Sequence, residues 1–166
     1  GQRGLGNGLC LPAGPLREPP RRLRQADFVV VNGRSPVTFD PRQITMNLKT
    51  EELVPLEPTR KHRGLPVHSK VNAVAAIGNP QRFFATLEAQ GYSLVPRVFP
   101  DHYLYAEPDV VFENGLTVVM TEKDYIKCAE FESLDQHWYL PVNAVLPDQF
   151  WNAFGKAVKT LKKKAS

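Results

Sequence analysis

Apolar runs separated by polar breaks follow one another from residue 70 onward, and they predict a series of strands. Residues 71–77 form an apolar run interrupted only by Asn72, which is typical of a strand buried on both faces of a parallel sheet. Residues 92–98, 116–120 and 138–142 predict three further strands. Helical patterns lie between and after these runs, so the order of elements favours an α/β layered fold with a mostly parallel sheet and flanking helices.

Three helices are predicted from their capping residues and apolar spacing. Asn79 suits the cap of the first helix, and Pro80 suits its first position because proline has no N–H to leave unpaired. Thr121 begins the second helix, where Asp124 three residues on makes a variant of the capping box. The third begins at residues 147–148, and its apolar positions are three and four apart: Trp151, Phe154, Val158 and Leu161.

The first 69 residues are rich in proline and carry weaker patterns. Residues 1–25 are predicted to form an irregular segment, and residues 26–32 a buried strand that ends at a turn. Residues 34–69 suggest short strands or a hairpin, in a β-ribbon-like arm. A charged loop is expected within that arm at residues 57–63.

The composition is that of a folded domain, with 42% hydrophobic and 23% charged residues among 166. Cys10 and Cys128 form no C-x-x-C pair and no cluster with histidine, which favours a reduced, cytoplasmic protein without a zinc site. No apolar stretch approaches the roughly 18–20 residues that span a bilayer. We therefore expect the chain itself to be soluble.

The net charge is +4, and part of the excess lies near the end of the chain. The residues concerned are Lys156, Lys159, Lys162, Lys163 and Lys164. A solvated helix face explains such a run, and so does attraction to anionic lipid or to nucleic acid. The charge alone leaves these alternatives open.

Polar residues follow three of the predicted strands. Asn79 follows the first, the pair Asp101–His102 follows the second, and Glu122–Lys123 follows the third. Ligands bind beyond the carboxyl ends of strands in open parallel sheets, so these residues are candidates for one shared rim. Each also has a purely structural explanation, since Asn79 and Glu122–Lys123 suit helix starts.

Two dipeptides carry candidate chemistry. His102 can relay a proton near neutral pH, and Asp101 can orient it, although a polar loop pair is the plain alternative. Arg17 and Glu18 lie between prolines, which limit their orientations, and a guanidinium held in this way suits contact with phosphate. An ordinary surface ion pair is the alternative for them.

No phosphate-binding loop of the form G-x-x-x-x-G-K-[ST] occurs in the chain. The glycines of residues 1–8 resemble a nucleotide loop only superficially, because no strand precedes them and no helical pattern follows. Without such a loop the chain lacks a backbone cradle for a triphosphate. The lysines near the end of the chain and the missing phosphate loop therefore also fit a basic α/β module that binds an anionic membrane or nucleic acid without catalysis.

Five segments together resemble a single family. In order they are GQRGLGNGLCLPAGPLREP at residues 1–19, ADFVVVNG at 26–33, AAIGNPQRFF at 75–84, FPDH at 99–102 and MTEKDYIKC at 120–128. Their order and spacing are similar to those of the tetraacyldisaccharide 4'-kinases, the lipid A 4'-kinases. The resemblance extends over nearly the whole chain.

This resemblance implies a P-loop kinase that transfers the γ-phosphate of ATP to the 4'-hydroxyl of tetraacyldisaccharide 1-phosphate, an acylated glucosamine disaccharide lipid. The product is lipid IVA, in lipid A biosynthesis. The resemblance also implies Mg²⁺, peripheral association with the cytoplasmic face of the bacterial inner membrane, and no nucleic acid partner. The P-loop, the metal-binding acids and a membrane-associated helix would lie upstream of Gly1. We therefore expect a C-terminal half that is inactive alone.

The resemblance assigns roles to individual residues. His102 matches a family histidine that pairs with an aspartate of the missing half and would help activate the sugar hydroxyl, and Asp101 would hold or polarise it. Arg17 and Glu18 match positions facing the nucleotide and metal, where Arg17 would neutralise developing phosphate charge. The family often has a second histidine at the position of Tyr103, so Tyr103 receives no catalytic weight. No residue of this chain is assigned as a metal ligand.

The family fold has two α/β lobes joined by a β-ribbon. By resemblance, residues 1–33 would be a remnant of the N-terminal P-loop kinase lobe and residues 34–69 the ribbon or linker region. Residues 70–166 would form the C-terminal α/β lobe with a terminal basic helix. A natural split subunit, whose partner supplies the phosphate loop, is a further interpretation.

Overall fold

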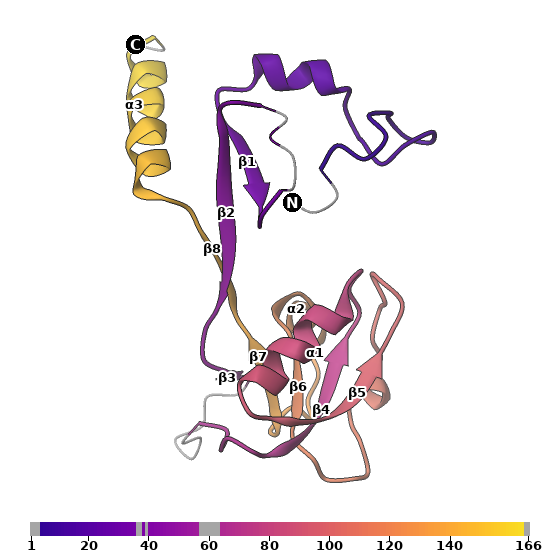
Figure 1. Ribbon diagram of the computed structural model, residues 1–166. Coiled ribbons are helices and arrows are strands. Elements are labelled where there is room, and N and C mark those ends of the chain that lie inside the picture. The colour runs from indigo at the N-terminus through magenta and orange to yellow at the C-terminus, as the bar shows by residue number, and fades with distance from the viewer. Residues whose placement is uncertain (1–3, 36–37, 39, 57–63, 165–166) are drawn as a thin grey trace. The chain divides into compact units, whose positions relative to one another are not determined.

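The computed structural model describes residues 4–35, 38, 40–56 and 64–164 (Figure 1). The chain divides into two compact units, one of Gly1–Lys49 with Asn143–Ser166 and the other of Thr50–Val142. We refer to them as unit 1 and unit 2. The boundaries at residues 33 and 69, which the resemblance implies, stay a prediction. The charged loop expected at residues 57–63 lies outside the described residues.

Unit 2 is built on a five-stranded sheet. Its strands are, in spatial order, β3 (Val54–Pro55), β7 (His137–Leu140), β6 (Val118–Thr121), β4 (Lys70–Ala75) and β5 (Ser93–Val98). Neighbouring strands from β7 to β5 are parallel, and β3 pairs antiparallel with β7. The predicted α/β fold with a mostly parallel sheet is therefore confirmed.

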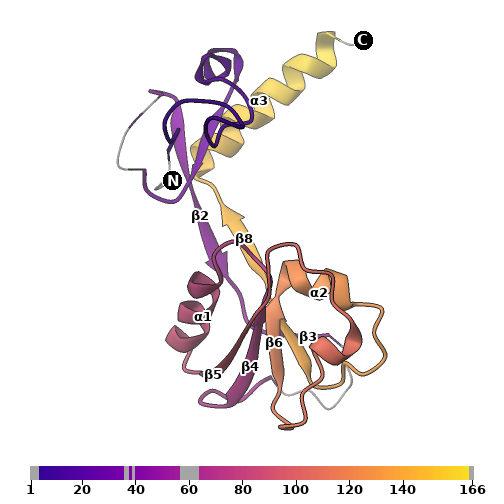
Figure 2. The same ribbon diagram turned by 90° about the vertical axis from the view of Figure 1, so that its right-hand side faces the viewer.

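Two helices cover the two faces of this sheet, α1 (Pro80–Ala89) and α2 (Glu122–Cys128) (Figure 2). Alternate residues of β4 point to opposite faces, so Val71 and Ala73 join one core cluster and Val74 joins the other. α1 contributes Phe83, Phe84 and Leu87 to the first cluster. The second contains Met120 and Cys128 with residues of the β5–β6 connection, which includes the short helix η2 (Glu107–Asp109).

Both predicted helix caps of unit 2 are present. The Asn79 side chain accepts a hydrogen bond of 3.4 Å from the Arg82 N–H at the start of α1. Thr121 Oγ1 accepts one of 3.2 Å from the Asp124 N–H at the start of α2. Because these caps satisfy backbone donors that have no partner within the helix, they fix where each helix begins.

Unit 1 contains a three-stranded sheet in the order β1 (Val29–Asn32), β2 (Gln43–Thr50), β8 (Val142–Val145). β1 and β2 are parallel. The short helix η1 (Pro20–Gln25) lies in the segment predicted to be irregular. β2 confirms a strand in the predicted arm, and its neighbours in the sheet are β1 and β8. The strand predicted at residues 138–142 is interrupted at Pro141, which has no N–H for a sheet ladder.

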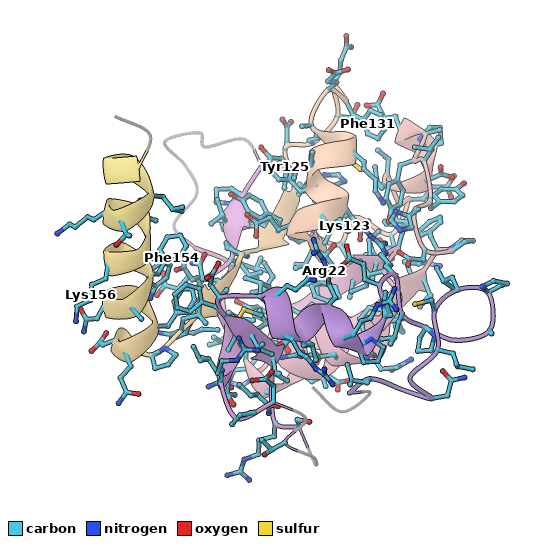
Figure 3. All side chains as sticks on the ribbon, turned by 90° about the horizontal axis from the view of Figure 1, so that it is seen from above. Arg22, Lys123, Tyr125, Phe131, Phe154 and Lys156 are labelled. Carbon is cyan, nitrogen blue, oxygen red and sulfur yellow. The ribbon has the colours of Figure 1, made fainter. Side chains whose placement is uncertain are left out.

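The last helix, α3 (Asp148–Lys164), follows β8 and carries Phe154 and Lys156 (Figure 3). Its anchor is Phe150, which is 9% exposed and meets the Phe28 ring edge-on at a centroid distance of 5.4 Å. The helix was predicted correctly, whereas its buried residue was not among the four apolar positions that the spacing selected. Trp151 and Leu161, two of those four, are 53% and 66% exposed.

Candidate functional site

The carboxyl ends of β4, β5 and β6 meet at one edge of the unit 2 sheet, because these strands are parallel neighbours. Gly78 follows β4, Asp101 and His102 follow β5, and Lys123 lies in the first turn of α2, after β6. A Cβ added at Gly78 would lie 3.5 Å from Asp101 Oδ2, so the connections after β4 and β5 approach closely. The three connections thus lie at one edge of the sheet, and their role as a ligand-binding rim stays a prediction.

Asp101 and His102 are the central residues of a tight turn. The Tyr103 N–H donates a hydrogen bond of 3.1 Å to the Pro100 carbonyl. His102 has φ +63°, at the turn position where positive φ usually requires glycine or asparagine. A histidine in this backbone conformation is sterically unfavourable, and such strain often marks functional positions.

Tyr103, the last residue of the turn, packs in an aromatic cluster. The Tyr103 ring lies 4.8 Å from the Phe99 ring and 5.3 Å from the Tyr105 ring. The Tyr103 hydroxyl donates a hydrogen bond of 3.3 Å to Asp109 Oδ2. Desolvation, followed by the charge of Asp109, raises the pKa of Tyr103 above its usual value. These contacts give Tyr103 a packing role at the end of the turn.

The Asp101 carboxylate holds both of its polar neighbours. Oδ1 accepts hydrogen bonds from the His102 N–H at 3.0 Å and from Lys123 Nζ at 3.3 Å. Oδ2 lies 3.8 Å from His102 Nε2. Desolvation acts to raise the pKa of Asp101, but the Lys123 hydrogen bond and the charge of His102 outweigh it, so this pKa lies below its usual value. An ionised Asp101 beside an imidazole that is 77% exposed can stabilise a proton arriving on that ring.

Asp124 anchors this edge from inside the protein. It is fully buried, and its Oδ2 accepts hydrogen bonds from the Ala76 N–H at 2.9 Å and from Thr121 Oγ1 at 2.7 Å. Its Oδ1 accepts one of 2.9 Å from Lys127 Nζ. The expected capping box is therefore only half right: Thr121 caps the helix, while the Asp124 carboxylate bonds to the end of β4.

The other predicted rim residues are engaged in local structure. Asn79 caps α1 through Arg82. Glu122 Oε2 accepts a hydrogen bond of 3.2 Å from the Val142 N–H. Only Asp101, His102 and Lys123 among the rim candidates share direct polar contacts among the described residues.

Arg17 and Glu18 belong to unit 1 and are exposed. Glu18 Oε2 accepts a hydrogen bond of 2.8 Å from Arg22 Nε, four residues on in η1. Both of these side chains are more than half exposed, and such pairs contribute about 0–1 kcal/mol to stability. Glu18 thus forms an exposed ion pair with Arg22, and the roles expected of Arg17 and Glu18 beside the nucleotide stay a prediction.

The described residues contain no group of three or more His, Cys, Asp or Glu side chains arranged to hold a metal ion. No helix within residues 4–35, 38, 40–56 and 64–164 is long and apolar enough to cross a membrane.

Comparison with known proteins assigns the chain to a family. A family model, LpxK, described as tetraacyldisaccharide-1-P 4'-kinase, matches residues 1–159. The chain belongs to the tetraacyldisaccharide-1-P 4'-kinase family. This confirms the resemblance drawn from the five sequence segments.

Individual family members are similar at close to half of their aligned positions. The chain is 46% identical over 152 residues to the tetraacyldisaccharide 4'-kinase of Alcanivorax borkumensis. The aligned region covers 89% of this chain and 44% of that protein. The match to the kinase of Legionella pneumophila strain Corby is 47% over 155 residues, with 93% and 46% covered. The chain thus spans slightly less than half the length of these relatives.

A solved structure has the same fold. It is the "apo" form of LpxK from Aquifex aeolicus in complex with ATP, which matches with a TM-score of 0.61 and 24% sequence identity. The match covers 90% of this chain and 48% of that one. Together with the family assignment, it places this chain within the fold of the tetraacyldisaccharide-1-P 4'-kinase family.

Proposed function

We propose that this chain is part of an ATP-dependent kinase that phosphorylates the 4'-hydroxyl of tetraacyldisaccharide 1-phosphate to give lipid IVA in lipid A biosynthesis. The observation that carries the proposal is the family match over residues 1–159. The names of the relatives at 46% and 47% identity support it. In this account the chain is the C-terminal half of the enzyme and is inactive alone.

His102 is the proposed proton acceptor for the sugar hydroxyl. Its ring is exposed and lies beside the Asp101 carboxylate, so a proton taken up by the imidazole gains a nearby negative charge. In full, the hydroxyl oxygen attacks the γ-phosphorus of ATP, the bond to the β–γ bridging oxygen breaks, ADP leaves, and the hydroxyl proton passes towards His102. Asp101 holds the turn through the His102 N–H and polarises the ring.

Arg17 is proposed to neutralise charge on the phosphates, and Glu18 to face the metal region. The planar guanidinium of Arg17 suits bidentate phosphate contact. Glu18 is a single carboxylate that already accepts from Arg22, so these residues fit only a small part of a Mg²⁺ site. Bound Mg²⁺ would supply charge neutralisation on the phosphates.

The proposed location is the cytoplasmic face of the inner membrane, bound peripherally. Lys156 and Lys159 are exposed on α3 and support this, since each basic side chain near an anionic surface is worth about 1 kcal/mol. Co-flotation with anionic vesicles, weakened by raising salt, is the expected behaviour.

A phosphoryl-transfer assay tests the proposal. The full-length protein and the 166-residue chain would each be incubated with γ-labelled ATP, Mg²⁺ and tetraacyldisaccharide 1-phosphate. We expect labelled lipid IVA from the full-length protein and none from the chain alone. A full-length protein that leaves this lipid unlabelled would overturn the proposed activity, and labelling by the chain alone would overturn the proposed dependence on the other half.

A further inference from the structure

Lys123 forms an ion pair with the Asp101–His102 turn. Its Nζ lies 3.3 Å from Asp101 Oδ1, the same oxygen that accepts the His102 N–H. The other oxygen of Asp101, Oδ2, lies 3.8 Å from His102 Nε2. One carboxylate therefore connects an ammonium, a strained backbone and an imidazole.

The position of Lys123 is set by the interior of the protein. It precedes the buried Asp124 in the first turn of α2. Asp124 bonds to the Ala76 N–H, at the end of β4, and to the hydroxyl of Thr121, which caps the helix. Lys127 Nζ occupies the second Asp124 oxygen. The first turn of α2, which carries Lys123, is consequently tied to the end of β4, the strand that pairs with β5 ahead of Asp101.

We propose that Lys123 is a positioning residue: it holds the Asp101 carboxylate in the orientation that presents the His102 ring to the acceptor hydroxyl. This inference rests on the proposed function. It concerns a residue to which neither the family name nor the names of the relatives assign a role.

Exposure explains why a positioning role is needed. The Asp101 side chain is 46% exposed, and an exposed carboxylate with no second partner rotates freely between orientations. The Lys123 ammonium removes that freedom for Oδ1. Since an exposed ion pair contributes little to stability, the consequence lies in geometry, where a displacement of about 1 Å can cost up to about 100-fold in rate.

The rival role for Lys123 is direct contact with substrate phosphate. The two roles differ in their kinetic signature. A residue that binds phosphate in the ground state raises KM when it is lost, whereas a residue that only orients a catalytic group lowers kcat and leaves KM unchanged. They also differ in dependence on Asp101, because only the positioning role acts through that carboxylate.

The first experiment uses the full-length protein with Lys123→Met and Lys123→Arg. We expect Lys123→Met to lower kcat about tenfold or more, with KM for ATP and for the lipid within about twofold of wild type. Lys123→Arg, which keeps the charge and the donors, should recover kcat to within about threefold. Lys70→Met is the matched control, since Lys70 is an exposed lysine at the opposite end of β4.

A double-mutant cycle with Asp101→Asn completes the test. If Lys123 acts through Asp101, adding Lys123→Met to Asp101→Asn should change kcat by less than about twofold. Multiplicative losses, an unchanged kcat in Lys123→Met, or a rise in KM alone would each overturn the inference. Wild-type thermal midpoints for the variants confirm that they are folded, and a midpoint drop that Lys123→Arg does not repair also counts against positioning.

The assay separates this inference from the proposed function. Inactive wild-type protein overturns the proposed function and this inference with it. Active wild-type protein with an unaffected Lys123→Met variant overturns the inference alone.

Discussion

The buried carboxylate of Asp124 accepts a hydrogen bond of 2.9 Å from the backbone N–H of Ala76, 48 residues earlier in the chain. This bond joins the end of β4, an interior strand of the sheet, to the first turn of α2. Both segments lead to the rim that carries Asp101, His102 and Lys123. The first turn of α2, which carries the exposed Lys123, is thus tied to β4 by a side chain that has no exposed surface.

Replacing Asp124 with alanine should be strongly destabilising. The change leaves the Ala76 N–H without its acceptor and Lys127, whose side chain is only 19% exposed, without its counter-ion. Breaking a buried pair from one side typically costs about 3–5 kcal/mol. Urea denaturation of the full-length protein measures the loss, with Glu130→Ala at an exposed position as the control. A loss below about 1 kcal/mol would remove Asp124 from this role.

The strained backbone of His102 makes a separate prediction. His102→Gly should raise the free energy of unfolding by about 0.5–1 kcal/mol, since glycine adopts φ +63° without steric cost. His68 has φ +68° and is also exposed, so His68→Gly should give a similar gain. Thermal or urea denaturation of the two variants provides the comparison. Destabilisation of both by about 1 kcal/mol, as in a helix interior, would show that positive φ is not costly here.

Stability should fall as pH decreases below about 6.5, in part because of His137. Burial lowers the pKa of His137 in the folded protein, despite the contact of its Nε2 with the Val110 carbonyl at 2.9 Å. The unfolded chain therefore binds a proton more readily than the folded one between the lowered pKa and the ordinary value, so stability is present above about 6.5 and is lost below it.

The His137→Gln variant isolates this contribution. Its free energy of unfolding should decline less than that of wild type between about pH 7.5 and pH 5, because glutamine takes up no proton. Denaturation curves at several pH values give the difference in slope. Equal declines in the two proteins would mean that His137 titrates alike in the folded and unfolded states.

The strands and helices of unit 2 could be predicted because buried strands and helix starts have recognisable patterns of apolar and polar residues. The apolar run at residues 71–77 marks a strand buried on both faces, and the polar residues Asn79 and Thr121 mark helix starts. Strand order then predicted which connections share an edge. It therefore predicted that Lys123 and Asp101 lie at the same edge of the sheet. No local pattern in the sequence specifies the ion pair between them.

Long-range partners could not be predicted in the same way. Asp124 fits a local capping pattern, and nothing in its neighbourhood indicates that its carboxylate bonds to Ala76. β2 reads as part of a local arm, but it lies between β1 and β8 from the far end of the chain. The pairing of Glu18 with Arg22 could have been predicted from their spacing of four residues. Only the prolines that flank Arg17 and Glu18 were considered in the prediction for these two residues.

The central claim is that this chain supplies His102 as the proton acceptor of a lipid kinase, and turnover of His102→Ala in the full-length protein tests it most directly. We predict a fall in kcat of about 10²–10⁴-fold, the usual contribution of general acid–base catalysis. His68→Ala, an exposed histidine in the same backbone conformation, should keep its turnover. A His102→Ala protein that phosphorylates tetraacyldisaccharide 1-phosphate at close to the wild-type rate would contradict the account.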